Sequence, residues 1–159
     1  MKAWLLIGLV VVSSVCMNGA DQTAKCTFSN QGYSIAPLDE APAGDTTYHC
    51  LTMFMPVSDG FAPNVVVQLQ RYTGTIAEYV ALSKLSLAAQ GMTITKESAT
   101  ETTVVFEYKG TFKGRPLHWY AKAVKNGAKV VLATAAATEG QWKTASEKLL
   151  KCVNSAEAN

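Results

Sequence analysis

The residues that could do chemistry are few and widely spaced along this 159-residue chain. Its only imidazole bases are His49 and His118, and each lies in a stretch whose alternation indicates a strand. A hydrolase needs a nucleophile, a base and an orienting group within reach of one another. No G-x-S-x-G, H-E-x-x-H or glycine-rich phosphate loop occurs. We therefore expect both histidines to be structural or exposed, and the chain to have no catalytic activity.

A possible metal cluster lies within HCLTMFM, where His49, Cys50, Met53 and Met55 offer the soft ligands that suit copper. The two-residue period of a regular strand puts His49, Met53 and Met55 on one face and Cys50 on the other. The four side chains then cannot converge, so we prefer ordinary strand packing. The acidic residues of the loop at 39–45 are expected to be solvated. We expect neither a metal nor a cofactor.

Two loops carry residue types that are favoured at protein interfaces. VSDGFAP offers one aromatic residue beside polar neighbours, and YKGTFKGRP offers another among basic ones. The alternative is that both loops are ordinary turns whose phenylalanines pack on the core, and the residues do not decide between the two. The candidate partner-binding residues are Ser58, Asp59, Phe61, Asn64, Lys109, Phe112, Lys113 and Arg115.

Residues 1–20 have the order of a secretory signal peptide, with Lys2 ahead of an apolar run and then small residues. The run is shorter than the roughly 20 apolar residues of a membrane span. We expect cleavage after Ala20 and a single periplasmic domain over 21–159. Lipidation at Cys16 is the alternative, but the preceding residue is a valine, whereas a lipobox prefers a small residue there. We expect no lipid anchor.

The bulk composition describes one globular domain, with 48% hydrophobic residues and a formal net charge of +2. No run of basic residues interleaved with aromatics occurs, so we expect no nucleic-acid partner. Export predicts at least one disulfide among Cys26, Cys50 and Cys152. We favour Cys26–Cys152, because Cys50 lies in an apolar strand, although the sequence leaves the connectivity open.

The elements that must position these residues are indicated by their periods and end signals. A capping box, Thr75 with Glu78, opens a helix whose apolar residues recur at helical spacing up to Gly91. A second box, Thr138 with Gln141, opens a helix with one apolar stripe. Other segments predict strands, at 32–38, 46–55, 64–72, 92–98, 102–110, 115–125 and 128–137.

Hairpins rather than repeated β-α-β units join these strands, so the sequence predicts an α+β domain. We expect a central antiparallel β-sheet flanked by helices on both faces. Segment 128–137 is apolar at successive positions, which predicts a central strand covered on both sides. Asn126-Gly127 predicts a two-residue hairpin turn, and Asp59-Gly60 predicts another turn.

The order of these elements and several short patches resemble the PsbP-like fold. The patches are GYSI, a strand ending in MP, APNVVVQLQ, VVFEYKG and GRPLHWYAKAVKNGAKVVLATAAAT, within Tyr33 to Val153. That family includes the PsbP subunits of photosystem II, the Ran-binding Mog proteins and exported bacterial proteins of the DcrB type. The resemblance implies an α/β/α sandwich that binds other proteins, and it transfers no catalytic residue.

Export, this resemblance and the missing catalytic set predict a non-enzymatic periplasmic protein that binds another protein. The most specific version is an immunity protein that inhibits a secreted wall-degrading toxin. The alternative is a small-molecule or metal-binding envelope protein that uses residues such as His49 or His118.

Overall fold

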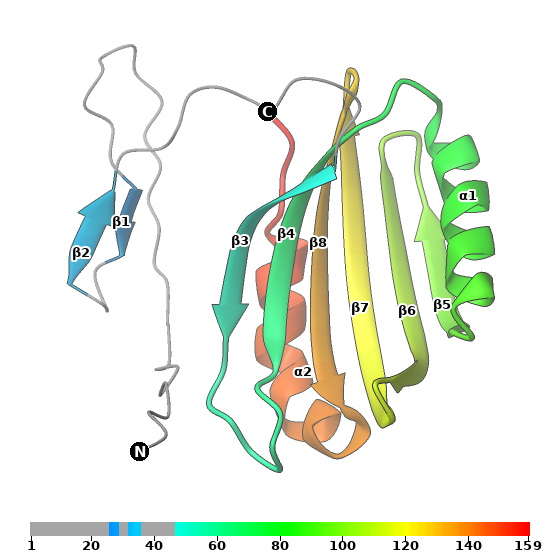
Figure 1. Cartoon of the computed structure of the whole chain (residues 1–159). Coiled ribbons are helices and arrows are strands. Elements are labelled where there is room, and N and C mark those ends of the chain that lie inside the picture. The colour runs from blue at the N-terminus through cyan, green and yellow to red at the C-terminus, as the bar shows by residue number, and fades with distance from the viewer. Residues whose placement is uncertain (1–25, 29–31, 36–46) are drawn as a thin grey trace.

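The computed structural model of the chain describes residues 26–28, 32–35 and 47–159. Its main body is a six-stranded antiparallel sheet in the order β3-β4-β8-β7-β6-β5 (Figure 1). The strands are β3 (Thr47–Phe54), β4 (Asn64–Arg71), β5 (Thr93–Ala99), β6 (Thr103–Phe112), β7 (Arg115–Asn126) and β8 (Lys129–Thr138). The helices are α1 (Ile76–Ala89) and α2 (Glu139–Asn154). These elements confirm the predicted order of strands and helices.

A separate two-stranded sheet pairs β1 (Cys26–Phe28) with β2 (Tyr33–Ile35). The second of these strands was predicted and the first was not, because three residues are too few to show a period. The predicted signal peptide, Cys16 and the acidic loop at 39–45 lie outside the described residues. Within the described residues, neither helix is both long and apolar enough to span a bilayer.

Helix α2 lies across one face of the sheet, against β4, β8 and β7 (Figure 1). Its predicted apolar stripe is confirmed, because Ala145, Leu149 and Val153 are buried and pack on Val65 and the alanines of β8. The predicted capping box is also present, with the Gln141 backbone N–H donating to the Thr138 hydroxyl. This face of the sheet is therefore fully covered at its centre.

Helix α1 packs on the opposite face, mainly against β5 and β6. Its Tyr79 packs with Val104 and Phe106 of β6 in a second core cluster. The chain crosses the end of the sheet at 72–75 and then descends beside β5 (Figure 1). A turn at Gly91, where φ is +70°, joins the helix directly to that edge strand. Neither described helix lies over the middle of β4, β8 and β7 on this side.

The expected α/β/α sandwich, with helices covering both faces, is therefore wrong. The described chain is dominated by its sheet and has two helices, of which only α2 covers the central strands. The 14-residue α1 is joined to β5 by a short turn and lies along that edge, and its Tyr79 side chain reaches the cluster that includes Val130 of β8. Strand β8 is central, as predicted, but a helix covers only one of its faces.

The predicted turn at Asp59-Gly60 is confirmed. Asp59 and Gly60 both have positive φ angles, 51° and 70°. Ser58 and Phe61 exchange two backbone hydrogen bonds of 3.0 Å across the turn. Asp-Gly is a favoured pair for such a turn because the glycine adopts this backbone conformation without strain.

The predicted Asn126-Gly127 turn is shifted by one residue. Asn126 pairs with Lys129, so Gly127 and Ala128 are the two turn residues. Gly127 has φ +58° at the first turn position, which is the place that a type II′ turn reserves for glycine. The hairpin itself is present, and only the register of its turn differs from the prediction.

Strand β3 contains an extra residue that changes which side chains share a face. His49 lies opposite Gln68, on the α1 side, and the register shifts at Cys50. Beyond this bulge Met53 lies opposite Val65, on the α2 side. The expectation that His49 and the methionines share one face is therefore wrong, because a bulge interrupts the two-residue period.

Candidate functional site

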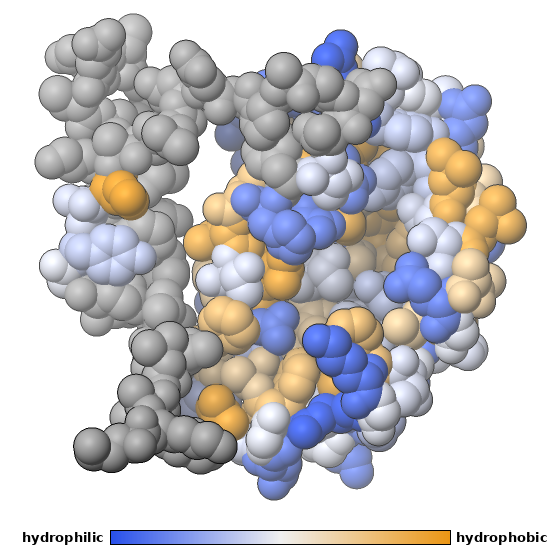
Figure 2. Space-filling model, in the orientation of Figure 1, coloured by the Kyte–Doolittle hydropathy of each residue, from blue (hydrophilic) through white to orange (hydrophobic). Residues whose placement is uncertain are grey.

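The open face of β4, β8 and β7 forms a trough beside α1 (Figure 2). Its floor is made of small side chains, including Ala121 and Ala123 of β7 and Thr134 of β8. Two hollows occupy it, with volumes of about 330 Å³ and 380 Å³. Both hollows are lined by Leu87 and Tyr108. The two hollows therefore lie next to each other along the trough.

The lining of the trough is apolar and uncharged. Among the described residues, neither hollow is lined by Lys, Arg, Asp, Glu or His. The polar groups that line the trough are amides and hydroxyls. Those of the first hollow belong to Gln70, Tyr72, Tyr79, Ser83, Ser86, Tyr108 and Thr134. The second hollow adds Asn64 and Gln90. Because charge is missing, the trough is suited to a neutral apolar ligand rather than to an ion or a nucleotide.

The tyrosines of the trough remain neutral hydroxyls over the physiological range. Burial raises the pKa of Tyr79 to about 12, although hydrogen bonds with Ser83 and Gln70 oppose this rise. Its hydroxyl donates to Gln70 Oε1 at 2.8 Å, and its ring contacts Tyr72 edge-on with centroids 5.3 Å apart. Burial also raises the pKa of Tyr108 to about 12. These groups can therefore donate hydrogen bonds but carry no charge.

The two loops predicted as separate binding candidates meet at one end of the trough. The Arg115 guanidinium donates to the Asp59 carbonyl at 2.7 Å and lies 5.9 Å from the centre of the Phe61 ring. Phe61 and Phe112 both line the second hollow. Sequence reasoning chose these residues by composition and could not place the loops together, because 56 residues separate Asp59 from Arg115.

The other predicted residues have mixed positions. Asn64 lines the second hollow, and its side-chain amide donates to the Ala62 carbonyl at 3.0 Å. Lys113 is exposed at the tip of the β6–β7 hairpin, with φ 51°. Ser58 faces α2 instead, where its carbonyl and hydroxyl oxygens each accept from Gln141 Nε2 at 2.7 Å.

Gln141 is a residue whose second role the sequence did not reveal. It is 7% exposed, and besides closing the capping box it donates to the Phe61 carbonyl at 3.0 Å. It therefore holds the Ser58–Phe61 turn against the start of α2. The S/T-x-x-Q pattern signals the cap alone, because no local pattern predicts a contact with a residue 80 positions away.

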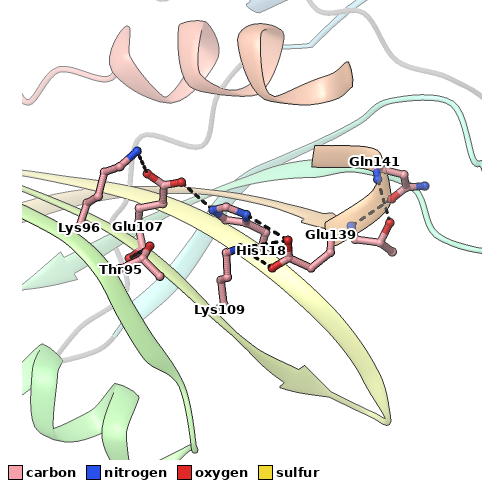
Figure 3. Close-up of polar contacts among 8 residues, drawn as sticks. Thr95, Lys96, Glu107, Lys109, His118, Glu139 and Gln141 are labelled. Carbon is pink, nitrogen blue, oxygen red and sulfur yellow. Dashed lines mark hydrogen bonds and ion pairs between the residues drawn. The ribbon is translucent and has the colours of Figure 1, made fainter. Parts of the chain in front are cut away.

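Lys109 lies on the α2 face, away from the trough, in a network of charged residues (Figure 3). Its ammonium group pairs with Glu139 at 3.0 Å. His118 Nε2 lies 2.7 Å from Glu107 Oε1, and its Nδ1 lies 3.8 Å from Glu139 Oε2. The His118 ring also stacks on Trp142 with centroids 3.9 Å apart. The network joins the first turn of α2 to the sheet.

Glu107 is ionised within this network. Burial by itself raises the pKa of this carboxyl group, but the hydrogen bonds from Lys96 and His118 and the electrostatic attraction to these groups outweigh burial, so the net shift is downward. Lys96 Nζ lies 2.8 Å from the second carboxylate oxygen. In the described network His118 contacts two carboxylates and the Trp142 ring, and no serine, threonine or cysteine is in the position that the nucleophile of a catalytic triad takes.

The metal candidates are not brought together. His49 is exposed, with Nε2 lying 3.3 Å from Gln68 Nε2, and Met53 lies on the other face. The described residues contain no group of three or more His, Cys, Asp or Glu that could hold a metal ion. The soft-ligand cluster suggested by the sequence is therefore separated by the bulge at Cys50.

The predicted disulfide stays a prediction. Cys152 is a half-buried free thiol on α2, and burial raises its pKa. The side chain of Cys26 lies outside the described part of the chain. A thiol with a raised pKa is a poor nucleophile, so Cys152 is not a candidate reactive group.

Comparisons with known proteins concern the fold. No protein-family model matches the chain, and no curated protein matches it. Among solved structures, PA94 from Pseudomonas aeruginosa, a protein of unknown function described as a putative regulator, has a similar fold. The TM-score is 0.58 with 14% identity, and the match covers 80% of this chain and 92% of that one. The PsbP-like resemblance remains a prediction.

Proposed function

We propose that this chain is a non-enzymatic binding domain that holds an uncharged, apolar segment of another protein in the trough. The observation that carries this proposal is that the two hollows lie side by side, sharing Leu87 and Tyr108, and that no charged residue lines either of them. A depression between a helix and a sheet can bury one side of a linear segment. Burial of apolar area then supplies the binding free energy, at about 25 cal/mol per Å².

The polar groups of the trough favour a polypeptide over a hydrocarbon chain. A peptide backbone carries both donors and acceptors, and the amides of Gln70 and Gln90 offer both kinds of group. Gln70 Oε1 already accepts from Tyr79, and Gln90 Nε2 already donates to Ser86, but an aliphatic chain would use none of the remaining donors and acceptors of these two amides. The aromatic residues at the loop end, Phe61 and Phe112, would act as anchors for large side chains of the partner.

The cellular role follows from the sequence predictions. The signal-peptide pattern at residues 1–20 supports export to the periplasm. The most specific version of the proposal is an immunity protein whose partner is a secreted wall-degrading enzyme. Its test is inhibition, because an immunity protein must abolish the activity of the enzyme that it binds at equal molar amounts.

A small apolar molecule is the second candidate ligand. Each hollow has a volume, about 330 Å³ or 380 Å³, within the range of ordinary small-molecule sites. Native mass spectrometry of the protein isolated from its own envelope distinguishes the two candidates. A retained mass of a few hundred daltons would favour the small molecule, and a polypeptide mass would favour the proposed function.

The decisive variant is Thr134→Trp, which places an indole on the floor of the first hollow. We expect it to abolish capture of the partner, because the ring fills the space that the apolar segment needs. The matched control is Thr111→Trp, an exposed position of β6 whose side chain points to the other face. Wild-type, Thr134→Trp and Thr111→Trp baits are compared on the envelope fraction of the native organism.

A specific partner is a polypeptide that the wild-type and Thr111→Trp baits retain and the Thr134→Trp bait loses. Thermal unfolding of the three baits must first show that all are folded. Equal retention by all three baits would exclude the trough as the binding site, whatever polypeptide is captured.

A further inference from the structure

Helix α1 is apolar on every side, including the side that points away from the sheet. Its inward side packs in the core through Tyr79 and Val80, and its only charged residues are Glu78 and Lys84. On the outward side Leu85 is 69% exposed, and Leu82, which is 56% exposed, lies at the rim of the trough. Figure 2 shows apolar residues gathered over this helix. A helix that is apolar all round is expected to be covered all round.

The outward face carries a projecting side chain and a hollow side by side. Ala77, Ala81 and Leu85, spaced four residues apart, form one ridge of the helix, and Leu85 is its only large member. A shallow hollow beside this ridge is lined by Ala77, Val80, Ala81, Lys84 and Leu85. The hollow exists because the alanines have no atoms beyond Cβ. The outward face of α1 is therefore self-complementary in shape, because it carries both a projecting leucine and a hollow that could receive one.

We propose that this face of α1 binds the same face of a second copy of the chain, with the two helices antiparallel. A two-fold axis at the level of residue 83 places Leu85 of each copy over Ala81 of the other. Each leucine then enters the hollow of the opposite helix, as an isologous contact requires. Glu78 lies at the level of Ala88 of the other copy. Lys84 lies one residue from the axis and therefore close to its own symmetry mate, but each Lys84 is paired with Glu97 of its own chain at 2.8 Å.

A second copy fits better than an unrelated partner because a symmetric contact fills the hollow of each helix with the Leu85 side chain of the other. The face of one 14-residue helix buries less than the roughly 800 Å² per partner of a standard stable interface. The dimer is therefore concentration-dependent rather than permanent. It is also separate from the proposed function, because the hollow on α1 shares no lining residue with the trough.

Sedimentation velocity over a concentration series tests this proposal on the purified protein. The dimer fraction is expected to rise with concentration, and Leu85→Glu is expected to weaken self-association by about tenfold or more, since it brings a carboxylate into the apolar contact. The matched control is Val57→Glu, which changes an apolar residue of similar exposure, 64%, on the β3–β4 connection. This control is expected to leave the dissociation constant unchanged.

A rescue experiment separates a direct contact from a general effect on solubility. Leu85→Glu and Ala81→Lys each weaken the dimer when studied alone. Mixed, they should form a heterodimer, because one contact pairs the new glutamate with the new lysine and the other keeps a native leucine over a native alanine. No recovery on mixing would overturn the antiparallel arrangement.

A wild-type protein that stays monomeric at every concentration overturns the proposal. If Leu85→Glu then lowers capture of the trough partner, the face docks on that partner instead. If it changes neither self-association nor capture, the face is covered from within the same chain or remains bare.

Discussion

At the scale of single residues, the most constrained group is the buried His118 between two carboxylates. Its ring stacks on Trp142, and its nitrogens face Glu107 and Glu139 from different elements. The sequence shows only a histidine in an alternating strand. The partners that make it structural come from β6, 11 residues away, and from α2, so residue identity alone could not decide its role.

Glu107→Gln is expected to lower the free energy of unfolding at pH 7 by about 1–3 kcal/mol, because charged hydrogen bonds to Lys96 and His118 are weakened. The folded-state pKa of Glu107 is lowered. Its contribution is therefore present above the ordinary value of 4.5 and is lost as the pH falls through the folded-state value. The difference in the free energy of unfolding between wild type and variant should therefore become smaller as the pH falls below 4.5. Urea unfolding at a series of pH values from 7 downward measures this difference.

The control for this prediction is Glu97→Gln, which removes a charge from a surface ion pair with Lys84. Exposed pairs contribute about 0–1 kcal/mol. An equal loss in both variants at pH 7 would mean that the network around His118 adds nothing beyond an ordinary surface pair.

At the scale of elements, local signals decided where helices begin and end. Both capping boxes formed as the sequence predicted, with the Thr75 hydroxyl accepting from the Glu78 backbone N–H and the Glu78 carboxylate accepting from the Thr75 N–H at 2.7 Å. Gly91 ends α1 with φ +70°. These contacts lie within four residues of one another, which is why pattern reasoning finds them.

Two glycine substitutions should change stability in opposite directions. Gly91→Ala is expected to cost about 1 kcal/mol, because a non-glycine residue is strained at φ +70°. Gly140→Ala, inside the first turn of α2, is expected to gain up to about 1 kcal/mol, because alanine loses less entropy there. A new Cβ meets no atom within 4 Å at either position, so a steric clash does not contribute to either change in stability. Chemical denaturation measures both, and a loss at both positions would contradict this account.

At the scale of the whole molecule, the two proposed binding surfaces share no lining residue. The trough lies on the open face of β4, β8 and β7, and the apolar face of α1 points away from the sheet. We predict that Thr134→Trp abolishes partner capture without changing self-association, and that Leu85→Glu does the reverse. The double variant should show the two losses added, because distant sites act independently.

This prediction is checked by measuring capture and sedimentation on the same four proteins, namely wild type, both single variants and the double variant. A single variant that changes both readouts would show that the surfaces are coupled. The two proposals would then stand or fall together instead of separately.

The sequence by itself determined the features that depend on near neighbours. Alternation located the strands of the main sheet, capping boxes started both helices, and Asp59-Gly60 formed its turn. These follow from backbone conformation and hydrogen bonds among residues a few positions apart.

Only the tertiary structure decided which faces are covered and which side chains meet. It held α1 at the β5 edge and left the trough open, shifted the face of His49 through the bulge at Cys50, and brought Arg115 to Asp59. The physical reason is that each of these outcomes is set by contacts between residues far apart in the chain. Such contacts depend on the lengths of connections and on the packing of the whole sheet, and no local period records them.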